Sequence, residues 1–202
     1  PSLEDYRVLT PGQIRQIRSK HDFMEHPPTG FKIDNSNTCN LDCLMCTRHA
    51  NADDPELIRK TEAEIAPFLP TAKVIYLTGN GEPLAIRHTR EMICGDYSFN
   101  PDLEFNLITN GLLLPKFWDR IQHQKFGDLM ISVDAATKTT YEKIRKGGTW
   151  ESLMKSLALV KCNRDRFRSV TINMTVMREN YREIPAFIDP RVQLWLPRAF
   201  PA

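Results

Sequence analysis

The chain has 202 residues, of which 41% are hydrophobic and 26% charged, a composition typical of a globular protein of one or two domains. Lysines and arginines number 27 and aspartates and glutamates 25, and they are spread along the chain, so no nucleic-acid surface is indicated. No apolar run approaches the roughly 20 residues that span a bilayer, and the N-terminus does not resemble a signal peptide. We therefore expect a cytoplasmic protein with no membrane or nucleic-acid partner.

Short runs rich in Val, Ile, Leu and Phe alternate with helical patterns along the chain. The runs predict strands over 31–36, 73–78, 103–109, 128–134, 169–177 and, from the weakest pattern, 192–196. Apolar residues at helical spacing predict helices between them, as over 55–68 and 140–160. Strands separated by helices predict a parallel sheet, either doubly wound or rolled into a full or partial (β/α) barrel, and the pattern does not distinguish the two.

Polar or glycine-rich segments follow the first five predicted strands: NSNTCN, TGNGEP, TNG, SVDAA and MREN. Parallel α/β proteins place functional residues at the carboxyl ends of their strands. Tight turns and helix caps are the alternative explanation for each segment taken alone. We expect a functional site at this end of the sheet.

The cysteines are unevenly placed, since Cys39, Cys43 and Cys46 lie within eight residues after the first strand, whereas Cys94 and Cys162 stand alone. Such clustering is atypical of a disulfide framework and indicates soft ligands for zinc or an iron–sulfur cluster. Both usually take four protein ligands in closed sites. Either His49 or a distant cysteine completes a zinc site, or the centre keeps an open coordination position, as catalytic sites do.

The C-x3-C-x2-C spacing after the first predicted strand resembles the motif of the radical S-adenosylmethionine (radical SAM) enzymes. TGNGEPL at 78–84 is similar to the GGEP segment of that family, with Asn80 in place of, or beside, a glycine, and TNG at 109–111 resembles the turn after its third strand. SVD at 132–134 with TYEKIR at 140–145 resembles its fourth βα unit, most of all in members that carry a SPASM or twitch cluster domain. That domain has no counterpart in this sequence.

The resemblance implies an α/β fold that is a partial (β/α) barrel of five to six parallel strands. Residues 1–30 would then be an N-terminal extension, and residues 31–202 the radical SAM core. The chain begins with Pro1 rather than Met, and its last predicted strand is followed at once by the chain end. We therefore expect the core to be incomplete at its C-terminus.

In such enzymes three cysteines bind three irons of a [4Fe-4S] cluster and S-adenosylmethionine binds the fourth, which implies this role for Cys39, Cys43 and Cys46. Reductive cleavage of the cofactor gives a deoxyadenosyl radical that abstracts hydrogen from the substrate. The resemblance also implies oxygen sensitivity and an electron donor such as flavodoxin or ferredoxin. It favours peptide, protein or small-molecule substrates without naming one. The alternatives are a zinc-binding interaction module and an electron-transfer iron–sulfur protein, which would want a fourth cysteine.

Seven residues are expected to bind S-adenosylmethionine: Gly79, Gly81, Glu82, Asn110, Ser132, Asp134 and Arg145. The glycines would let the backbone approach the methionine part of the cofactor, and Glu82 would accept from its ammonium group.

Ser132 and Asp134 alternate along a strand, so we expect both on one face, at the ribose. Arg145 would bind the carboxylate of the cofactor. The competing explanations are a turn at Asn110, a helix cap at Asp134 and a solvated Glu82 or Arg145.

Overall fold

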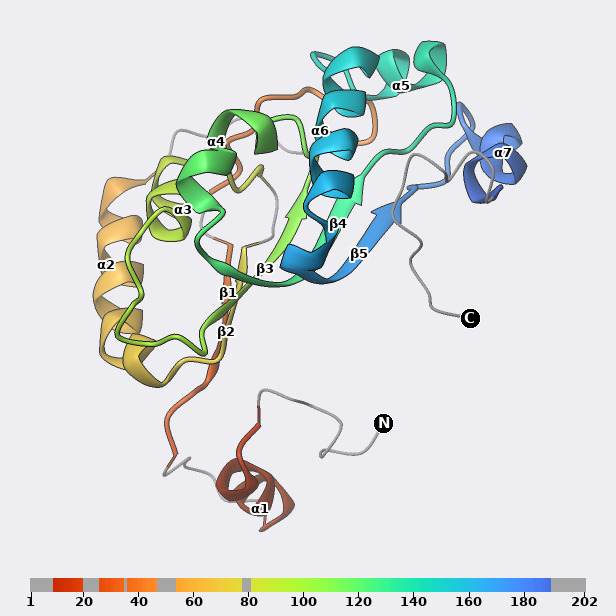
Figure 1. The fold of residues 1–202 in the computed structure, drawn as a ribbon. Coiled ribbons are helices and arrows are strands. Elements are labelled where there is room, and N and C mark those ends of the chain that lie inside the picture. The colour runs from red at the N-terminus through yellow and green to blue at the C-terminus, as the bar shows by residue number, and fades with distance from the viewer. Residues whose placement is uncertain (1–8, 20–25, 35, 47–53, 78–80, 190–202) are drawn as a thin grey trace.

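The computed structural model describes residues 9–19, 26–34, 36–46, 54–77 and 81–189. Five strands form one parallel sheet in the order β1-β2-β3-β4-β5 (Figure 1). Their bounds are β1 Gly30–Ile33, β2 Val74–Leu77, β3 Glu104–Thr109, β4 Lys125–Ser132 and β5 Phe167–Asn173. Because each strand pairs with the next along the chain, the sheet follows the winding of a partial (β/α) barrel and not that of a doubly wound fold.

The register of the sheet aligns a row of buried aliphatic side chains, one from each strand. Ile33 pairs with Leu77, Leu77 with Leu107, Leu107 with Leu129, and Leu129 with Val170. All five are buried in the hydrophobic core. Since a shift by one residue would turn this row to the other face, burial of the row fixes the register.

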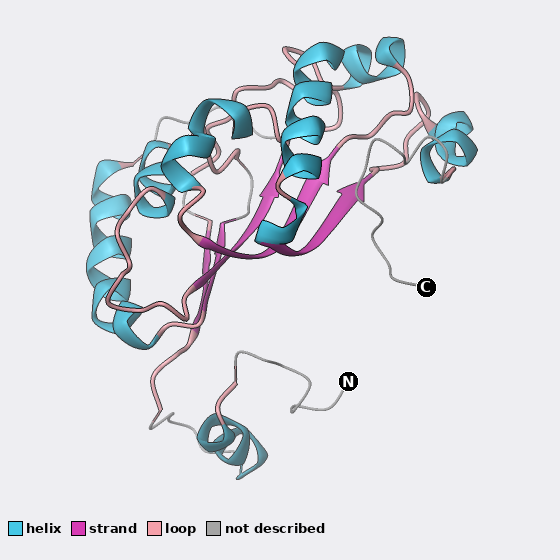
Figure 2. Ribbon diagram, viewed as in Figure 1, coloured by secondary structure: helices cyan, strands magenta, loops and turns pink. Residues whose placement is uncertain are grey.

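The helices of the βα units cover one face of the sheet (Figure 2). They are α2 Pro55–Ile65, α3 Arg87–Ile93, α4 Leu114–Ile121 and α6 Trp150–Cys162, while α5 Lys138–Ile144 lies beyond the carboxyl ends of the strands. Helix α1 Pro11–Ser19 precedes the sheet and α7 Ile184–Ile188 follows it. Tyr76 and Ile108 alternate with core residues and remain partly exposed on the uncovered face. No helix among the described residues has the length and apolarity needed to cross a membrane.

The first five predicted strands are present with shifted ends, and the sixth, at 192–196, lies outside the described residues. Strand β4 ends at Ser132 instead of residue 134, because Asp134 adopts a left-handed φ of 63° that leaves the strand conformation. Strand β5 ends at Asn173 instead of residue 177.

The helix predicted over 140–160 is wrong as one element, because α5 and α6 are separate. Gly147 between them has a φ of +91°, which a right-handed helix does not contain. The side chain of Thr149 then accepts from the N–H of Ser152 and begins α6. The helix predicted over 55–68 stops at Ile65 and continues as a 3-10 helix, Ala66–Thr71.

Candidate functional site

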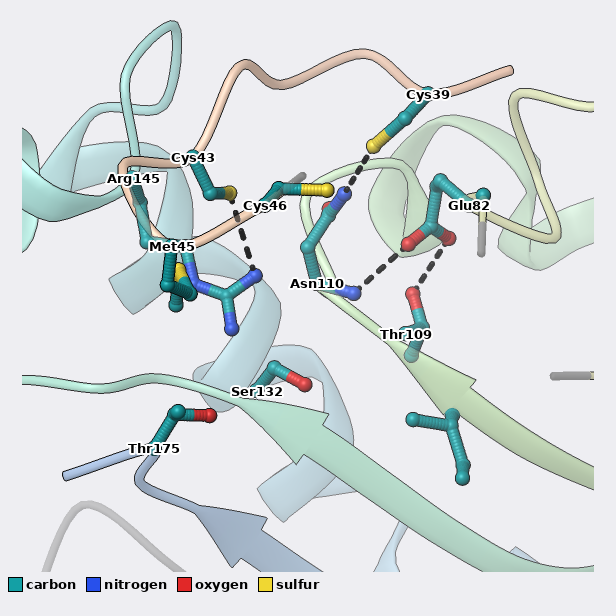
Figure 3. A pocket seen from close by; sticks show the side chains of 12 residues that line it. Cys39, Cys43, Met45, Cys46, Glu82, Thr109, Asn110, Ser132, Arg145 and Thr175 are labelled. Atoms are coloured by element: carbon teal, nitrogen blue, oxygen red, sulfur yellow. Dashed lines mark hydrogen bonds between the residues drawn. The ribbon is translucent and has the colours of Figure 1, made fainter. Parts of the chain in front are cut away.

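A cavity of about 240 Å³ lies at the carboxyl end of the sheet. It is lined by Cys39, Cys43, Met45, Cys46, Gly81, Glu82, Ile108, Thr109, Asn110, Ser132, Arg145 and Thr175. These residues come from the last positions of β3 and β4 and from the segments that follow all five strands. Figure 3 shows the three cysteines on one stretch of chain, with Asn110, Ser132 and Thr175 across from them. A cavity therefore lies at the end of the sheet where the sequence predicts a functional site.

The loop that carries Cys39, Cys43 and Cys46, here called the cysteine loop (36–46), is attached to the end of helix α5. The N–H of Asp42 donates to the carbonyl of Lys146 at 2.9 Å, and the N–H of Leu44 donates to that of Ile144 at 2.8 Å. Ile144 is the last residue of α5 and Lys146 follows its C-cap, so neither carbonyl has a partner within the helix, and the cysteine loop provides one. The two bonds flank Cys43 and fix its backbone.

On its other side the cysteine loop packs against Gly81. The N–H of Glu82 donates to the carbonyl of Thr38 at 2.9 Å, and a Cβ built on Gly81 would lie 2.5 Å from that carbonyl oxygen. A side chain at this position would therefore separate the two loops. Gly81 lines the cavity as predicted, but the close approach that requires glycine is to the cysteine loop itself.

Glu82 is almost fully buried beneath the cavity, with 2% of its surface exposed. Its carboxylate accepts from the Thr109 hydroxyl at 2.6 Å and from the N–H of Asn110 at 2.8 Å (Figure 3). Burial raises the pKa of Glu82 above its usual value, and these hydrogen bonds oppose the rise. Glu82 is thus not a solvated side chain, because it joins the segment after β2 to the end of β3.

Asn110 directs its amide toward the cysteine loop. Its Nδ2 donates to Asn40 Oδ1 at 2.9 Å and to Cys39 Sγ at 3.8 Å, while its Oδ1 accepts from the N–H of Leu112 at 3.0 Å. The turn itself depends on Gly111, whose φ is +81°. Asn110 therefore forms part of the turn and also lies in the site.

The expectation that Ser132 and Asp134 share a face is wrong. Ser132 lines the cavity, whereas Asp134 is fully buried outside the lining residues. The left-handed backbone at Asp134 interrupts the alternation of a strand. Asp134 is not the cap of α5 either, because Thr137 is, through its side chain and the N–H of Thr140.

Arg145 is a buried residue of the site, with 9% of its surface exposed, and not a surface arginine. Its Nη1 donates to Cys43 Sγ at 3.6 Å, and its Nη2 forms an ion pair with Asp134. Burial raises the pKa of the Cys43 thiol, and the charge of Arg145 opposes that rise. The positive charge thus lies beside both a thiol and a carboxylate.

Two polar residues of the MREN segment and its continuation were not predicted. Asn180 is fully buried and donates to the Asp134 carbonyl at 2.8 Å and to the Thr175 carbonyl at 2.9 Å. Glu183 accepts from the N–H of Ala136 at 2.7 Å and from the Thr137 hydroxyl at 2.8 Å. Together they tie the segment after β5 to the segment after β4, and only the polarity of MREN signalled such a role.

Other candidates lie elsewhere. Cys94 caps the end of α3 and Cys162 ends α6, and neither lines the cavity. Gly79 and His49 lie outside the described residues. Within the ranges that the structure describes, no group of three or more His, Cys, Asp or Glu side chains is arranged to hold a single metal ion. The zinc alternative therefore has no support from these residues.

Comparison with known proteins gives a family and several relatives. The Radical SAM superfamily model matches residues 36–189. A probable GTP 3',8-cyclase from Methanococcus maripaludis is 25% identical over 181 residues, 87% of this chain and 55% of that protein. Mycofactocin maturase MftC from Mycobacterium tuberculosis is 28% identical over 152 residues, 74% of this chain and 38% of that protein. The chain therefore spans between a third and about half of these relatives.

Among solved structures, SuiB of Streptococcus suis bound to S-adenosylmethionine matches with a TM-score of 0.59. The match covers 88% of this chain and 42% of SuiB at 16% identity, so it bears on the fold. It confirms the partial barrel expected from the motifs. Because the family model covers most of the chain and includes the cysteine loop and every described element of the cavity, the chain belongs to the radical SAM superfamily.

Proposed function

We propose that this chain is the core of a radical SAM enzyme, with a [4Fe-4S] cluster on Cys39, Cys43 and Cys46 and S-adenosylmethionine in the adjoining cavity. The observation that carries the proposal is the placement of three thiols from one loop at one cavity. Two N–H donors, from Asn110 and Arg145, already point at two of those sulfurs. Hydrogen bonds to cysteine sulfur are a common feature of iron–sulfur sites.

The residues present fit such a cluster in their chemistry. Thiolates are the ligands that iron–sulfur clusters take, and each of three cysteines would bind a different iron, so they need not surround one ion. Among the residues that the structure describes, the cavity lining contains no fourth Cys and no His. That set leaves one iron to be bound by something other than these residues, as S-adenosylmethionine would do.

A [4Fe-4S] cluster held by Cys39, Cys43 and Cys46 would supply one electron for cleavage of S-adenosylmethionine to methionine and a deoxyadenosyl radical, which would abstract hydrogen from the substrate. The chain binds and orients the reactants. Ser132 and Asn110 offer a hydroxyl and an amide to the polar parts of the cofactor. Glu82, whose carboxylate accepts from Thr109 and Asn110, would also accept from the ammonium group of the cofactor.

Gly79 and Gly81 would complete the wall on the methionine side, and Arg145 keeps its Nε without a hydrogen-bond partner among the described residues. Arg145 lines the cavity, and its guanidinium would bind the cofactor carboxylate. We do not extend the ribose role to Asp134, because its carboxylate is engaged by Arg145 and by the N–H of Thr175 at 2.6 Å.

For the substrate, the proposal is a peptide, a protein or a small molecule reached from the uncovered face of the sheet. The relatives differ in this respect, since one is named a GTP cyclase and another a maturase, and SuiB has been crystallised with its precursor peptide SuiA. An electron donor such as flavodoxin or ferredoxin would reduce the cluster, and we place the reaction in the cytoplasm.

The test is anaerobic reconstitution with iron and sulfide, followed by counting of iron and an assay for deoxyadenosine after addition of dithionite and S-adenosylmethionine. We expect about four irons per chain and deoxyadenosine that appears only with the cofactor. Cys43→Ala should lose both, whereas Cys162→Ala, which removes an exposed thiol at the end of α6, should lose neither. One tightly bound zinc without cofactor cleavage would contradict the proposal.

A further inference from the structure

The buried ion pair of Arg145 and Asp134 lies directly behind Cys43. Arg145 uses one terminal nitrogen for Asp134 and the other for the Cys43 sulfur, so its guanidinium bridges a carboxylate and a thiol. Arg145 is 9% exposed and Asp134 is 0% exposed. Because water screens buried charges weakly, a charge here acts on Cys43 more strongly than a surface charge at the same distance.

Asp134 is held by hydrogen bonds from the segment after β5, one to its carboxylate and one to its backbone carbonyl. Its Oδ1 accepts from the N–H of Thr175, and its carbonyl accepts from the side chain of the fully buried Asn180. Its left-handed backbone turns the side chain away from the strand direction that Ser132 follows. The segment after β5 thus sets the orientation of the carboxylate, which forms the ion pair with the guanidinium.

The backbone around Arg145 and the backbone around Cys43 are also joined. Arg145 is the C-cap of α5, and the carbonyls of its neighbours Ile144 and Lys146 accept from Leu44 and Asp42, the neighbours of Cys43. The side-chain contact between Arg145 and Cys43 therefore lies between two backbone hydrogen bonds. This arrangement fixes the position of the guanidinium relative to the sulfur before any cofactor binds.

We propose that Arg145, whose place beside Cys43 is set by the backbone bonds between the end of α5 and the cysteine loop, raises the reduction potential of the cluster on Cys43 independently of S-adenosylmethionine, and that the Asp134 carboxylate, as its counter-charge, lowers it. The inference rests on the proposed function. Reduction adds one negative charge to the cluster, and a buried cation that donates to a ligand sulfur stabilises the reduced form. This role differs from binding the cofactor carboxylate, which would act only when S-adenosylmethionine is present.

The two charges of the pair act in opposite directions on the cluster. Removing the positive charge of Arg145 leaves the Asp134 carboxylate without its counter-charge near Cys43, which disfavours reduction. Replacing Asp134 by Asn keeps an acceptor for Thr175 and tolerates a left-handed backbone, while it removes the negative charge. The two substitutions should therefore move the reduction potential in opposite directions.

The experiment is a redox titration of the reconstituted 202-residue protein without S-adenosylmethionine, followed by electron paramagnetic resonance. Arg145→Gln should lower the midpoint potential by at least about 59 mV, a tenfold smaller ratio of reduced to oxidised cluster at a fixed potential. Asp134→Asn should raise the midpoint. Lys146→Gln is the matched control, because it removes the same charge from the adjacent, exposed side chain and should leave the midpoint within error of wild type.

Iron content and thermal unfolding are measured for each variant, so a loss of folding is recognised. If Arg145→Gln does not hold a cluster, the midpoint potentials of Asp134→Asn and Arg145→Lys test the inference instead. Arg145→Lys keeps the charge and loses the planar pair of donors. Unchanged midpoints in Arg145→Gln and Asp134→Asn would overturn the inference, as would an effect of Arg145→Gln on cofactor affinity alone. A wild-type protein that binds no cluster would instead contradict the proposed function.

Discussion

Glu82 and Asp134 are both buried carboxylates next to the cysteine loop, yet the protein stabilises them in different ways. Glu82, after β2, accepts from the Thr109 hydroxyl and from backbone N–H groups, all of them neutral donors. Asp134, after β4, has the charged partner Arg145 as well as a backbone N–H. On one side of the loop the carboxylate accepts hydrogen bonds from neutral donors and is attracted only weakly by the charge of Arg145, whereas on the other side the carboxylate forms a direct ion pair with Arg145.

This difference determines whether Glu82 or Asp134 tolerates the loss of its charge. Burial raises the pKa of Glu82, so this site favours the neutral acid relative to water. Asp134 compensates a guanidinium that is itself buried, so loss of its charge leaves an unpaired cation. The Glu82 side should therefore accept a neutral side chain of similar shape, and the Asp134 side should not accept loss of the whole carboxylate.

The largest effect on stability is expected from Asp134→Ala. Removing one partner of a buried ion pair costs about 3–5 kcal/mol of unfolding free energy, because the other charge stays buried without compensation. Alanine is also disfavoured at the left-handed φ of 63°. Chemical denaturation under anaerobic conditions would measure the loss.

The double variant Asp134→Ala with Arg145→Met serves as the control for this prediction. Since it removes the uncompensated cation, it should be more stable than Asp134→Ala alone. Equal stability of the single and double variants would show that the charge of Arg145 is not what destabilises the single variant.

The strands and their order at the site were predictable because they depend on local pattern. Runs of β-branched and aliphatic residues marked the five described strands, and the polar segments after them marked the end of the sheet that carries the cavity. The cysteine spacing is likewise a local feature. These signals need no knowledge of what packs against them.

The partners of the site residues were not predictable, because they depend on contacts between distant segments. The alternation rule placed Asp134 beside Ser132, and only its left-handed backbone, stabilised by Thr175 and Asn180 from after β5, turns it toward Arg145. In the same way, the sequence did not show that Gly81 also lies close to the Thr38 carbonyl. A single sequence does not show which loops contact one another in the folded protein.

Gly81→Ala, on the Glu82 side of the cysteine loop, should have an intermediate effect on stability. The added methyl group would meet the Thr38 carbonyl at 2.5 Å and the Ile86 side chain at 2.8 Å. Because the first of these is backbone, relief requires the two loops to separate, at a cost of about 1–3 kcal/mol. We expect a lower denaturation midpoint and reduced retention of iron after reconstitution. Gly95→Ala, outside the cavity, is the comparison variant, and an equal loss of iron there would contradict the explanation.

The smallest effect is expected from Glu82→Gln. The amide keeps the shape and one acceptor oxygen, so about 1 kcal/mol should be lost at neutral pH, when one of the donors from β3 loses its partner.

The pH dependence sharpens this prediction. A carboxyl whose pKa is raised in the folded state binds protons more readily there than in the unfolded chain. Its contribution to stability therefore grows as the pH falls from neutral toward the ordinary pKa of a glutamate, and it is lost as the pH rises through the folded pKa. Glutamine does not titrate, so it makes no such pH-dependent contribution to stability. The stability of wild type relative to Glu82→Gln should therefore increase as the pH falls, measured by denaturation at matched salt. A difference that shrinks toward acid pH would mean that Glu82 is held mainly as a charged acceptor, and the contrast with Asp134 would then fail.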